Sequence, residues 1–393
     1  MTCKNMTREE LNIDLKAAVA ANCPDRAREL LEQGADPNTK YESNMTLLYK
    51  STLSGYIECA KLLLEYGADP NVAVFSKNSS LHHTASGSDT EIVRLLLSAG
   101  ADINLRNWFG DTPLKTAIQS GNINVFKILL DARTDPNDIS TVESNSVYYA
   151  AQLSCGDFLK LFIEAGADPF MTDKHKRTLM HMAALSGSLE CAELMFGLGA
   201  DVNAADHYGN TPLHDAARTE KISCVTFLIN SGADINAVNN AGDTPLMQAA
   251  IGESENALHA MISAGANMDI ANKASETALH IAVQGHNSKC ANILLKAGAD
   301  PFKATFFGWT ALHTAASYGR IGLMKNIIKR GGSLFAPDKK KCTPLDILKE
   351  YSYDKYVEYA DKLIELDGKA AAKRLKKEDR QGAENTGYEF SGI

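Results

Sequence analysis

Apolar residues in the middle of the chain occur at helical spacing, in two short runs separated by polar residues. In residues 211–231, Ala216 and Ala217 belong to the first run, and Val225 and Leu228 belong to the second. Spacings of three and four residues place apolar side chains on one face of a helix. The pattern therefore predicts a pair of short helices, each with one buried face.

The residues that flank these runs favour the starts and ends of helices. Thr211 can cap the first helix, and Pro212 suits its first turn, where a backbone N–H would have no partner. Gly232 follows the second helix, where a left-handed backbone costs glycine little. Asp234 and Asn236 favour the turn that comes next. Each unit is therefore expected to be a helix pair followed by a reversal of the chain.

The same unit returns every 33 residues without insertion or deletion. A fixed period of this length indicates a repeat array, in which a helix pair buries its apolar face only against its neighbours. The opening motif gives eleven helix pairs, the first starting at Ile13 and the last at Thr343. The position of the closing glycine is held by Gly34, Gly67, Gly100, Arg133, Gly166, Gly199, Gly232, Gly265, Gly298 and Gly331.

The repeated motif resembles the ankyrin repeat, over nearly the whole chain. The resemblance rests on Thr-Pro-Leu-His opening a helix, Ala-Ala inside it, Leu-Leu in a second helix, and then Gly-Ala-Asp-x-Asn. It implies an all-α solenoid of stacked antiparallel helix pairs. In that fold a β-turn finger projects sideways after each pair.

Four segments are expected along the chain. Residues 1–33 are predicted to form an N-terminal capping repeat, and 34–342 the repeat array. Residues 343–367 form a C-terminal capping repeat, and 368–393 a basic helical extension with a disordered tail. Residues 131–157 have the poorest match to the cap and turn residues of the repeat. This indicates either drift of the repeat sequence or a flexible joint or specialised contact site.

Composition narrows the class of protein. The formal net charge of −8 argues against nucleic-acid binding, which requires a basic surface. No apolar run approaches the length of a membrane-spanning helix, so no membrane insertion is expected. The polar stretch at 1–15 does not resemble a secretory signal.

Four cysteines share one position of the repeat, early in the second helix. Neighbouring layers of helices lie about 8–10 Å apart, whereas a disulfide tolerates Cα atoms at most ~7 Å apart. These thiols are therefore predicted to be small buried side chains, as in a protein of the cytoplasm or the nucleus. They are Cys59, Cys191, Cys224 and Cys290.

Five histidines also share one position, for which the resemblance implies a structural hydrogen bond between neighbouring turns. They are His82, His181, His214, His280 and His313. No Cys-x-x-Cys pair, His-Glu-x-x-His stretch or phosphate-binding Gly-x-x-x-x-Gly-Lys motif occurs. We therefore expect no catalytic residue, metal, cofactor or small-molecule substrate, and no enzyme activity.

The resemblance places contacts with partner proteins at the finger tips and just after the Ala-Ala pair. Aromatic and basic residues occupy several of these positions. Exposed aromatics at turn tips favour contact with a partner, although packing against neighbouring fingers is the alternative. The predicted partner-binding residues are Phe75, Trp108, Phe109, Lys174, His175, Arg177, His207, Tyr208, Phe306, Phe307, Trp309 and Tyr318.

The sequence thus predicts a non-enzymatic scaffold or adaptor that binds a protein through its concave face and fingers. The alternatives are a targeting subunit that recruits substrates to a ligase or phosphatase, and a host-directed effector of an intracellular microbe or virus. In the tail, Lys373 to Arg380 fits a nuclear-import signal less well than a charged helix end. Ser391-Gly392-Ile393 resembles a ligand for domains that add a C-terminal strand, although such short patterns are common by chance.

Overall fold

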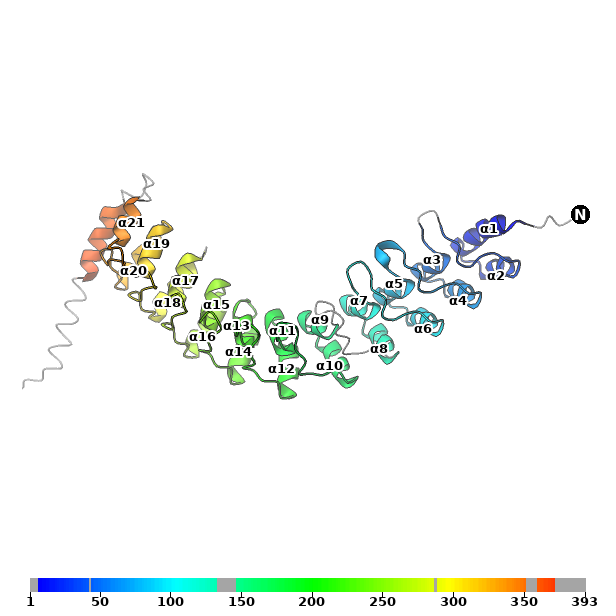
Figure 1. Cartoon of the computed structure of the whole chain (residues 1–393), viewed down its shortest axis with the longest axis horizontal. Coiled ribbons are helices and arrows are strands. Elements are labelled where there is room, and N and C mark those ends of the chain that lie inside the picture. The colour runs from blue at the N-terminus through cyan, green and yellow to red at the C-terminus, as the bar shows by residue number, and fades with distance from the viewer. Residues whose placement is uncertain (1–5, 42–43, 133–145, 286–287, 351–358, 372–393) are drawn as a thin grey trace, which may run out of the picture. The chain divides into compact units, whose positions relative to one another are not determined.

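The computed structural model describes residues 6–41, 44–132, 146–285, 288–350 and 359–371. The chain divides into two compact units, Met1–Met171 and Thr172–Ile393. Each unit is a stack of antiparallel helix pairs (Figure 1), which confirms the predicted all-α solenoid.

The first unit contains the helices of the five N-terminal repeats. Its elements are α1 (Arg8–Ala20), α2 (Pro24–Glu32), α3 (Leu47–Leu53), α4 (Ile57–Glu65), the 3-10 turn η1 (Phe75–Lys77), α5 (Ser80–Ser86), α6 (Thr90–Ser98), α7 (Pro113–Gln119), α8 (Ile123–Asp131), α9 (Ser146–Gln152) and α10 (Gly156–Glu164).

The second unit contains the later repeats and a further helical stretch at 359–371. Its elements are α11 (Leu179–Ser186), α12 (Leu189–Gly197), α13 (Pro212–Ala217), α14 (Ile222–Asn230), α15 (Pro245–Ile251), α16 (Glu255–Ser263), α17 (Ala278–Gln284), α18 (Ser288–Ala297), α19 (Ala311–Ser317), α20 (Ile321–Lys329) and α21 (Pro344–Glu350).

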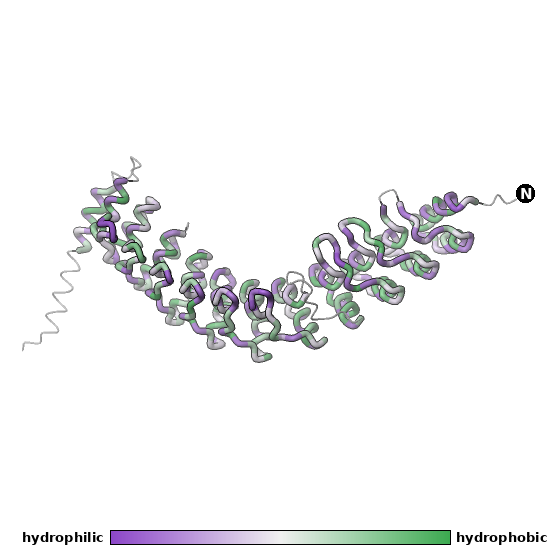
Figure 2. The backbone as a smooth tube through the Cα atoms, viewed as in Figure 1, coloured by the Kyte–Doolittle hydropathy of each residue, from purple (hydrophilic) through white to green (hydrophobic). Residues whose placement is uncertain are grey.

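Within each unit the helices form two layers. Odd-numbered helices pack on the next odd-numbered helix, and even-numbered helices pack on the next even-numbered one. Hydrophobic residues recur along the helices from one pair to the next (Figure 2). Small alanines at the first-helix contacts, such as Ala216 and Ala217, are fully buried and allow close approach of neighbouring layers.

The predicted starts of the first helices are confirmed by their caps. At α7 the Thr112 hydroxyl accepts the backbone N–H of Lys115 at 3.3 Å, and Pro113 occupies the first turn. At α1, Thr7 and Glu10 form a capping box, in which the Thr7 backbone nitrogen lies 2.8 Å from the Glu10 carboxylate.

The closing glycine has the predicted backbone conformation. Gly232 follows α14 with φ of +88°, a value that side chains other than glycine seldom adopt. Its neighbour Ala233 donates its N–H to Leu228 O at 3.0 Å, which satisfies a carbonyl at the end of the helix. The motif therefore ends each second helix and directs the chain into the finger.

Asparagine side chains tie successive fingers at their bases. In the first unit the Asn71 amide donates to Gly100 O at 3.2 Å and its oxygen accepts the Asp102 N–H at 2.7 Å. In the second unit Asn203 makes the same pair of bonds to Gly232 O and the Asp234 N–H. These bonds fix each repeat relative to the next one.

The four cysteines that share one position of the repeat, Cys59, Cys191, Cys224 and Cys290, are buried, as predicted. Burial raises the pKa of the Cys224 thiol to about 11, with a smaller contribution from Cys191. The core of the first unit includes a group of buried aromatic rings. Phe126 contacts Phe158 and Phe162 edge to face, at centroid distances of 4.8 and 4.9 Å.

Two predicted segments are only partly described. Helix α9 forms within the weak segment at 131–157 and α10 begins at its end, whereas 133–145 lies outside the described residues. At the C-terminus α21 begins at a Thr343–Asp346 cap, and residues 359–371 are helical. The predicted disorder, the basic stretch Lys373 to Arg380 and the motif Ser391-Gly392-Ile393 lie outside the described part of the chain.

Candidate partner-binding surface

Backbone hydrogen bonds join the finger tips of the second unit into a continuous ladder. Each tip donates one N–H to a carbonyl of the preceding tip, at 2.7–3.2 Å. The pairs are His207 with His175, Asn240 with Tyr208, Lys273 with Ala241, Phe306 with Ala274, and Lys339 with Phe307. Because the backbone of the tips is tied in this way, their side chains project outward on a fixed frame.

The aromatic side chains on this frame are exposed. Phe306 and Phe307 are 62% and 68% exposed, and Tyr208 is 56% exposed. Phe306 and Phe307 touch each other edge to face at 5.5 Å, and Tyr208 stacks on His175 at 6.0 Å. Packing between fingers therefore covers only part of each ring, and most of its surface is available to a partner.

In the first unit two neighbouring finger tips carry three aromatic residues, Phe75 on one and Trp108 and Phe109 on the next. Trp108 donates its backbone N–H to Ser76 O at 2.9 Å, within the turn that starts at Phe75. Trp108 and Phe109 are 70% and 76% exposed, more than any other large hydrophobic residue described. This unit therefore presents its own apolar finger surface.

A groove of about 410 Å³ lies beside the Phe307 finger in the second unit. It runs between the fingers and the first helices α17 and α19. Phe307 and Tyr318 are its exposed aromatic residues, and Glu276 contributes the carboxylate. The lining consists of Ala274, Glu276, Gln284, Thr305, Phe307, Trp309, Thr314, Ser317 and Tyr318.

Trp309 is held in place as a wall of this groove. Its indole N–H donates to the Asp338 carboxylate at 3.1 Å, and its ring stacks on buried His313 at 6.2 Å. The residue is half-buried. Of the predicted contact residues near the groove, Trp309 is therefore the one with a clear structural role, while most of the surface of Phe307 and Tyr318 is exposed.

Charged side chains surround the aromatic residues of the groove. The Arg320 guanidinium lies 5.6 Å from the Tyr318 ring and donates to Gln284 O at 3.3 Å. The Gln284 amide in turn donates to the Glu276 carboxylate at 2.7 Å. A cation over an aromatic face is favourable, and this network limits the rotation of the groove walls.

The predicted basic positions at the start of the second unit differ in their surroundings. Arg177 forms an ion pair with Asp173 at 2.7 Å, and Asp173 is buried. Lys174 and His207 are exposed at the finger tips, whereas His175 is half-buried under Tyr208. The structure thus brings His175, His207 and Tyr208 together and uses Arg177 to hold its own finger.

Asp215 follows the structural histidine of α13 and was not singled out from the sequence. Its half-buried carboxyl is the titratable group with the most altered pKa on this face. Burial raises the pKa of Asp215 to about 7, and the nearby Asp206 carboxylate adds to the effect, while Arg177 and Arg218 oppose it. The signal appears only in the fold, because it depends on residues from two repeats.

Because its pKa is higher in the folded than in the unfolded chain, Asp215 makes folding less favourable as pH rises from about 4 to about 7. We expect Asp215→Asn to raise the free energy of unfolding by about 1–2 kcal/mol at pH 8, after allowing for solvent screening. At pH 4 the two proteins should be equally stable. Urea unfolding at both pH values checks this, and equal stability at pH 8 contradicts it.

The five histidines of the repeat have the structural role implied by the resemblance. Each lies behind a Ser or Thr cap, and its Nε2–H donates to a carbonyl of the next finger. Its Nδ1 accepts the backbone N–H of the cap. Burial lowers the pKa of all five imidazoles, which favours the neutral form.

The described residues contain no group of three or more His, Cys, Asp or Glu side chains placed to hold a metal ion. Within the same residues, no helix combines the length and the apolar character needed to cross a membrane.

Protein-family models account for most of the chain. A model described as ankyrin repeats (3 copies) matches residues 73–140, 147–239 and 236–305. The chain belongs to the ankyrin-repeat family. Further ankyrin models match residues 15–64 and 307–334, so ankyrin repeats extend through both units. No curated protein matches the chain at a significant level.

Ankyrin repeats are in general modules for protein–protein interaction, and their all-helical fold is typically a binding scaffold without catalysis. The coarse functional prediction therefore follows from membership of the family. The choice of contact residues within the ankyrin array is not decided by the family match, and it rests on the exposed finger aromatics and the groove.

Proposed function

We propose that this ankyrin array is an adaptor that binds a protein partner through its finger tips and concave face. The groove beside Phe307 and Tyr318 is the principal contact in this proposal. The protein acts by binding, without catalysis, in the cytoplasm or the nucleus.

The observation that carries the proposal is the combination of a tied backbone with exposed aromatic rings. Binding normally costs free energy because side chains and loops lose freedom. The ladder from His175 to Lys339 removes much of that cost in advance, since the tips are already fixed. A few residues contribute most of the binding free energy of a protein interface, and aromatic side chains in well-packed pockets are common among them.

The proposal predicts that the groove aromatics decide which proteins are captured. We expect Phe307→Ser combined with Tyr318→Ser to lose a partner that the wild type retains from a cell lysate. With the purified partner, the affinity should fall by at least about 30-fold, since a single hot-spot residue contributes about 2 kcal/mol or more. Affinity purification with mass spectrometry, followed by calorimetry, measures both effects.

A matched control separates the groove from general surface hydrophobicity. Phe302 and Phe335 are 51% and 54% exposed and lie outside the groove lining. The double variant Phe302→Ser and Phe335→Ser should retain the partner. If this control loses the partner and the groove variant keeps it, the proposal is wrong. The identity of the partner also distinguishes a general adaptor from a targeting subunit of a ligase or phosphatase, or from a host-directed effector.

A further inference from the structure

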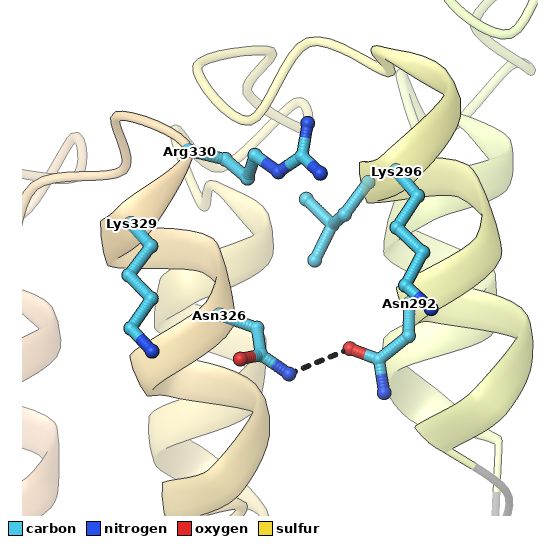
Figure 3. A pocket seen from close by; sticks show the side chains of 6 residues that line it. Asn292, Lys296, Asn326, Lys329 and Arg330 are labelled. Atoms are coloured by element: carbon cyan, nitrogen blue, oxygen red, sulfur yellow. Dashed lines mark hydrogen bonds between the residues drawn. The ribbon is translucent and has the colours of Figure 1, made fainter.

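A second concave site lies on the other layer of helices, between α18 and α20. It is a slot of about 320 Å³ lined by Asn292, Leu295, Lys296, Asn326, Lys329 and Arg330. Figure 3 shows Lys296 and Lys329 on its two opposite sides, with Arg330 extending from its own helix toward α18. None of these residues lines the aromatic groove.

The slot is positive although the whole chain carries a net charge of −8. Helices α18 and α20 contain no Asp or Glu, and Lys296, Lys329 and Arg330 are exposed. None of these three cations forms an ion pair with a described carboxylate. By contrast, Lys289 at the start of α18 pairs with Glu255 at 3.0 Å. Lys289, which lies outside the slot, is therefore neutralised within the protein, whereas the three cations of the slot can bind an anion from outside.

One side of the slot is formed by a pair of amides. The Asn326 amide donates to the Asn292 oxygen at 2.8 Å, as Figure 3 shows. This bond leaves the Asn292 amide group with donors to offer and holds both side chains across the gap between the helices. The slot thus combines charged donors with neutral ones, and no carboxylate lines it.

Stabilisation of the helix ends explains only part of this arrangement. Lys296 and Lys329 lie in the last turns of α18 and α20, where a cation suits the helix dipole. Arg330 follows the end of α20 and extends across the slot instead of folding over its own helix end. A guanidinium in that position presents a planar fork of donors, which fits two oxygens of one anion.

We propose that this slot binds a phosphate monoester carried by a side chain of a partner protein. A phosphate group supplies close to two negative charges and three acceptor oxygens at neutral pH, which matches three cations with adjacent amide donors. The slot is open to solvent at its charged side chains, so it has room for the chain that carries the phosphate.

The test uses the full-length protein and a fluorescein-labelled peptide, Ala-Ala-phosphoserine-Ala-Ala, with its unphosphorylated counterpart. Fluorescence anisotropy at low salt should show at least about tenfold tighter binding of the phosphopeptide, because the charge-assisted bonds require the phosphate. The variant Lys296→Gln/Lys329→Gln/Arg330→Gln should lose that preference. Lys273→Gln/Lys303→Gln/Lys340→Gln removes three exposed lysines elsewhere in the same unit, and it should keep it.

Three results overturn the proposal. One is equal binding of the two peptides by the wild type, or no binding of either at 1 mM peptide, a concentration that detects affinities of about −4 kcal/mol. Another is an equal loss of binding in both lysine variants, which indicates only general charge attraction. The third is displacement by inorganic phosphate at the same concentration as the peptide, which assigns the slot to a free anion. Circular dichroism confirms that the variants remain folded.

Discussion

Replacing His214 by alanine is expected to lower the free energy of unfolding by about 2–4 kcal/mol, although the residue has no catalytic role. Its imidazole is fully buried. The Nε2–H donates to Asp243 O at 3.0 Å, and Nδ1 lies 3.1 Å from the Thr211 N and 2.9 Å from its hydroxyl. Alanine removes all of these partners and leaves a cavity, so several buried polar groups lose their hydrogen bonds.

Urea unfolding of both proteins at pH 7.5, followed by circular dichroism, measures this difference. The exposed finger residue His207 provides the control, because its side chain projects into solvent. His207→Ala should change the free energy of unfolding by less than about 0.5 kcal/mol, as surface substitutions usually do. Equal effects of the two substitutions would contradict the structural role of the repeated histidine.

The sequence predicted this role because the histidine is part of a repeated pattern. A position that returns every 33 residues with the same neighbours reports on the scaffold, since each copy meets the same local structure. The helix cap at Thr112 and the closing Gly232 were predicted for the same reason. The cap and the glycine depend on residues within a few positions of one another, whereas the histidine bond reaches the next finger and was implied by the resemblance to the ankyrin repeat.

Contacts between two repeats that involve residues outside the repeated motif could not be predicted from the sequence. Trp309 was predicted to be a contact residue at a finger tip. The sequence did not predict that its indole N–H donates to Asp338, one finger further along the chain. The raised pKa of Asp215 arises from burial and from a carboxylate of the preceding finger. The basic slot combines Lys296 with Arg330, which no short motif links. Lys296 and Lys329 share one position of the repeat, but the neighbouring repeats have unrelated residues at the positions of Trp309, Asp215 and Arg330, so the period gives no information about these three.

The scaffold depends on residues that are the same in successive repeats, whereas the proposed binding surfaces depend on residues that differ between them. The histidine and asparagine ties satisfy backbone groups identically in successive layers, which makes the array stable without a large single core. Phe307 and Arg330 occupy positions at which the neighbouring repeats have unrelated residues. Their location on a frame that is already fixed is the physical reason to assign recognition to them.

Mild acid is expected to destabilise this protein, because unfolding exposes five buried histidines that then bind protons. Burial lowers the pKa of each one below its ordinary value of 6.5. The unfolded chain therefore binds more protons than the folded one as pH falls below about 6.5, and stability decreases. Asp215 acts in the opposite direction between pH 4 and 7, since its pKa is raised when the chain folds.

Each such proton contributes at most about 1.4 kcal/mol per pH unit, so five histidines outweigh one carboxyl. We expect the free energy of unfolding to fall as pH decreases from 6.5 to 5, because the five imidazoles bind more protons in the unfolded chain than in the folded one. Carboxylates with lowered pKa values, such as Asp173 and Asp338, contribute only at lower pH. Urea unfolding at half-unit steps of pH measures how steeply the free energy of unfolding depends on pH. His214→Ala should lower this dependence by up to the contribution of one proton, about 1.4 kcal/mol per pH unit. A slope of zero in this interval would mean that the imidazoles of the folded array titrate normally.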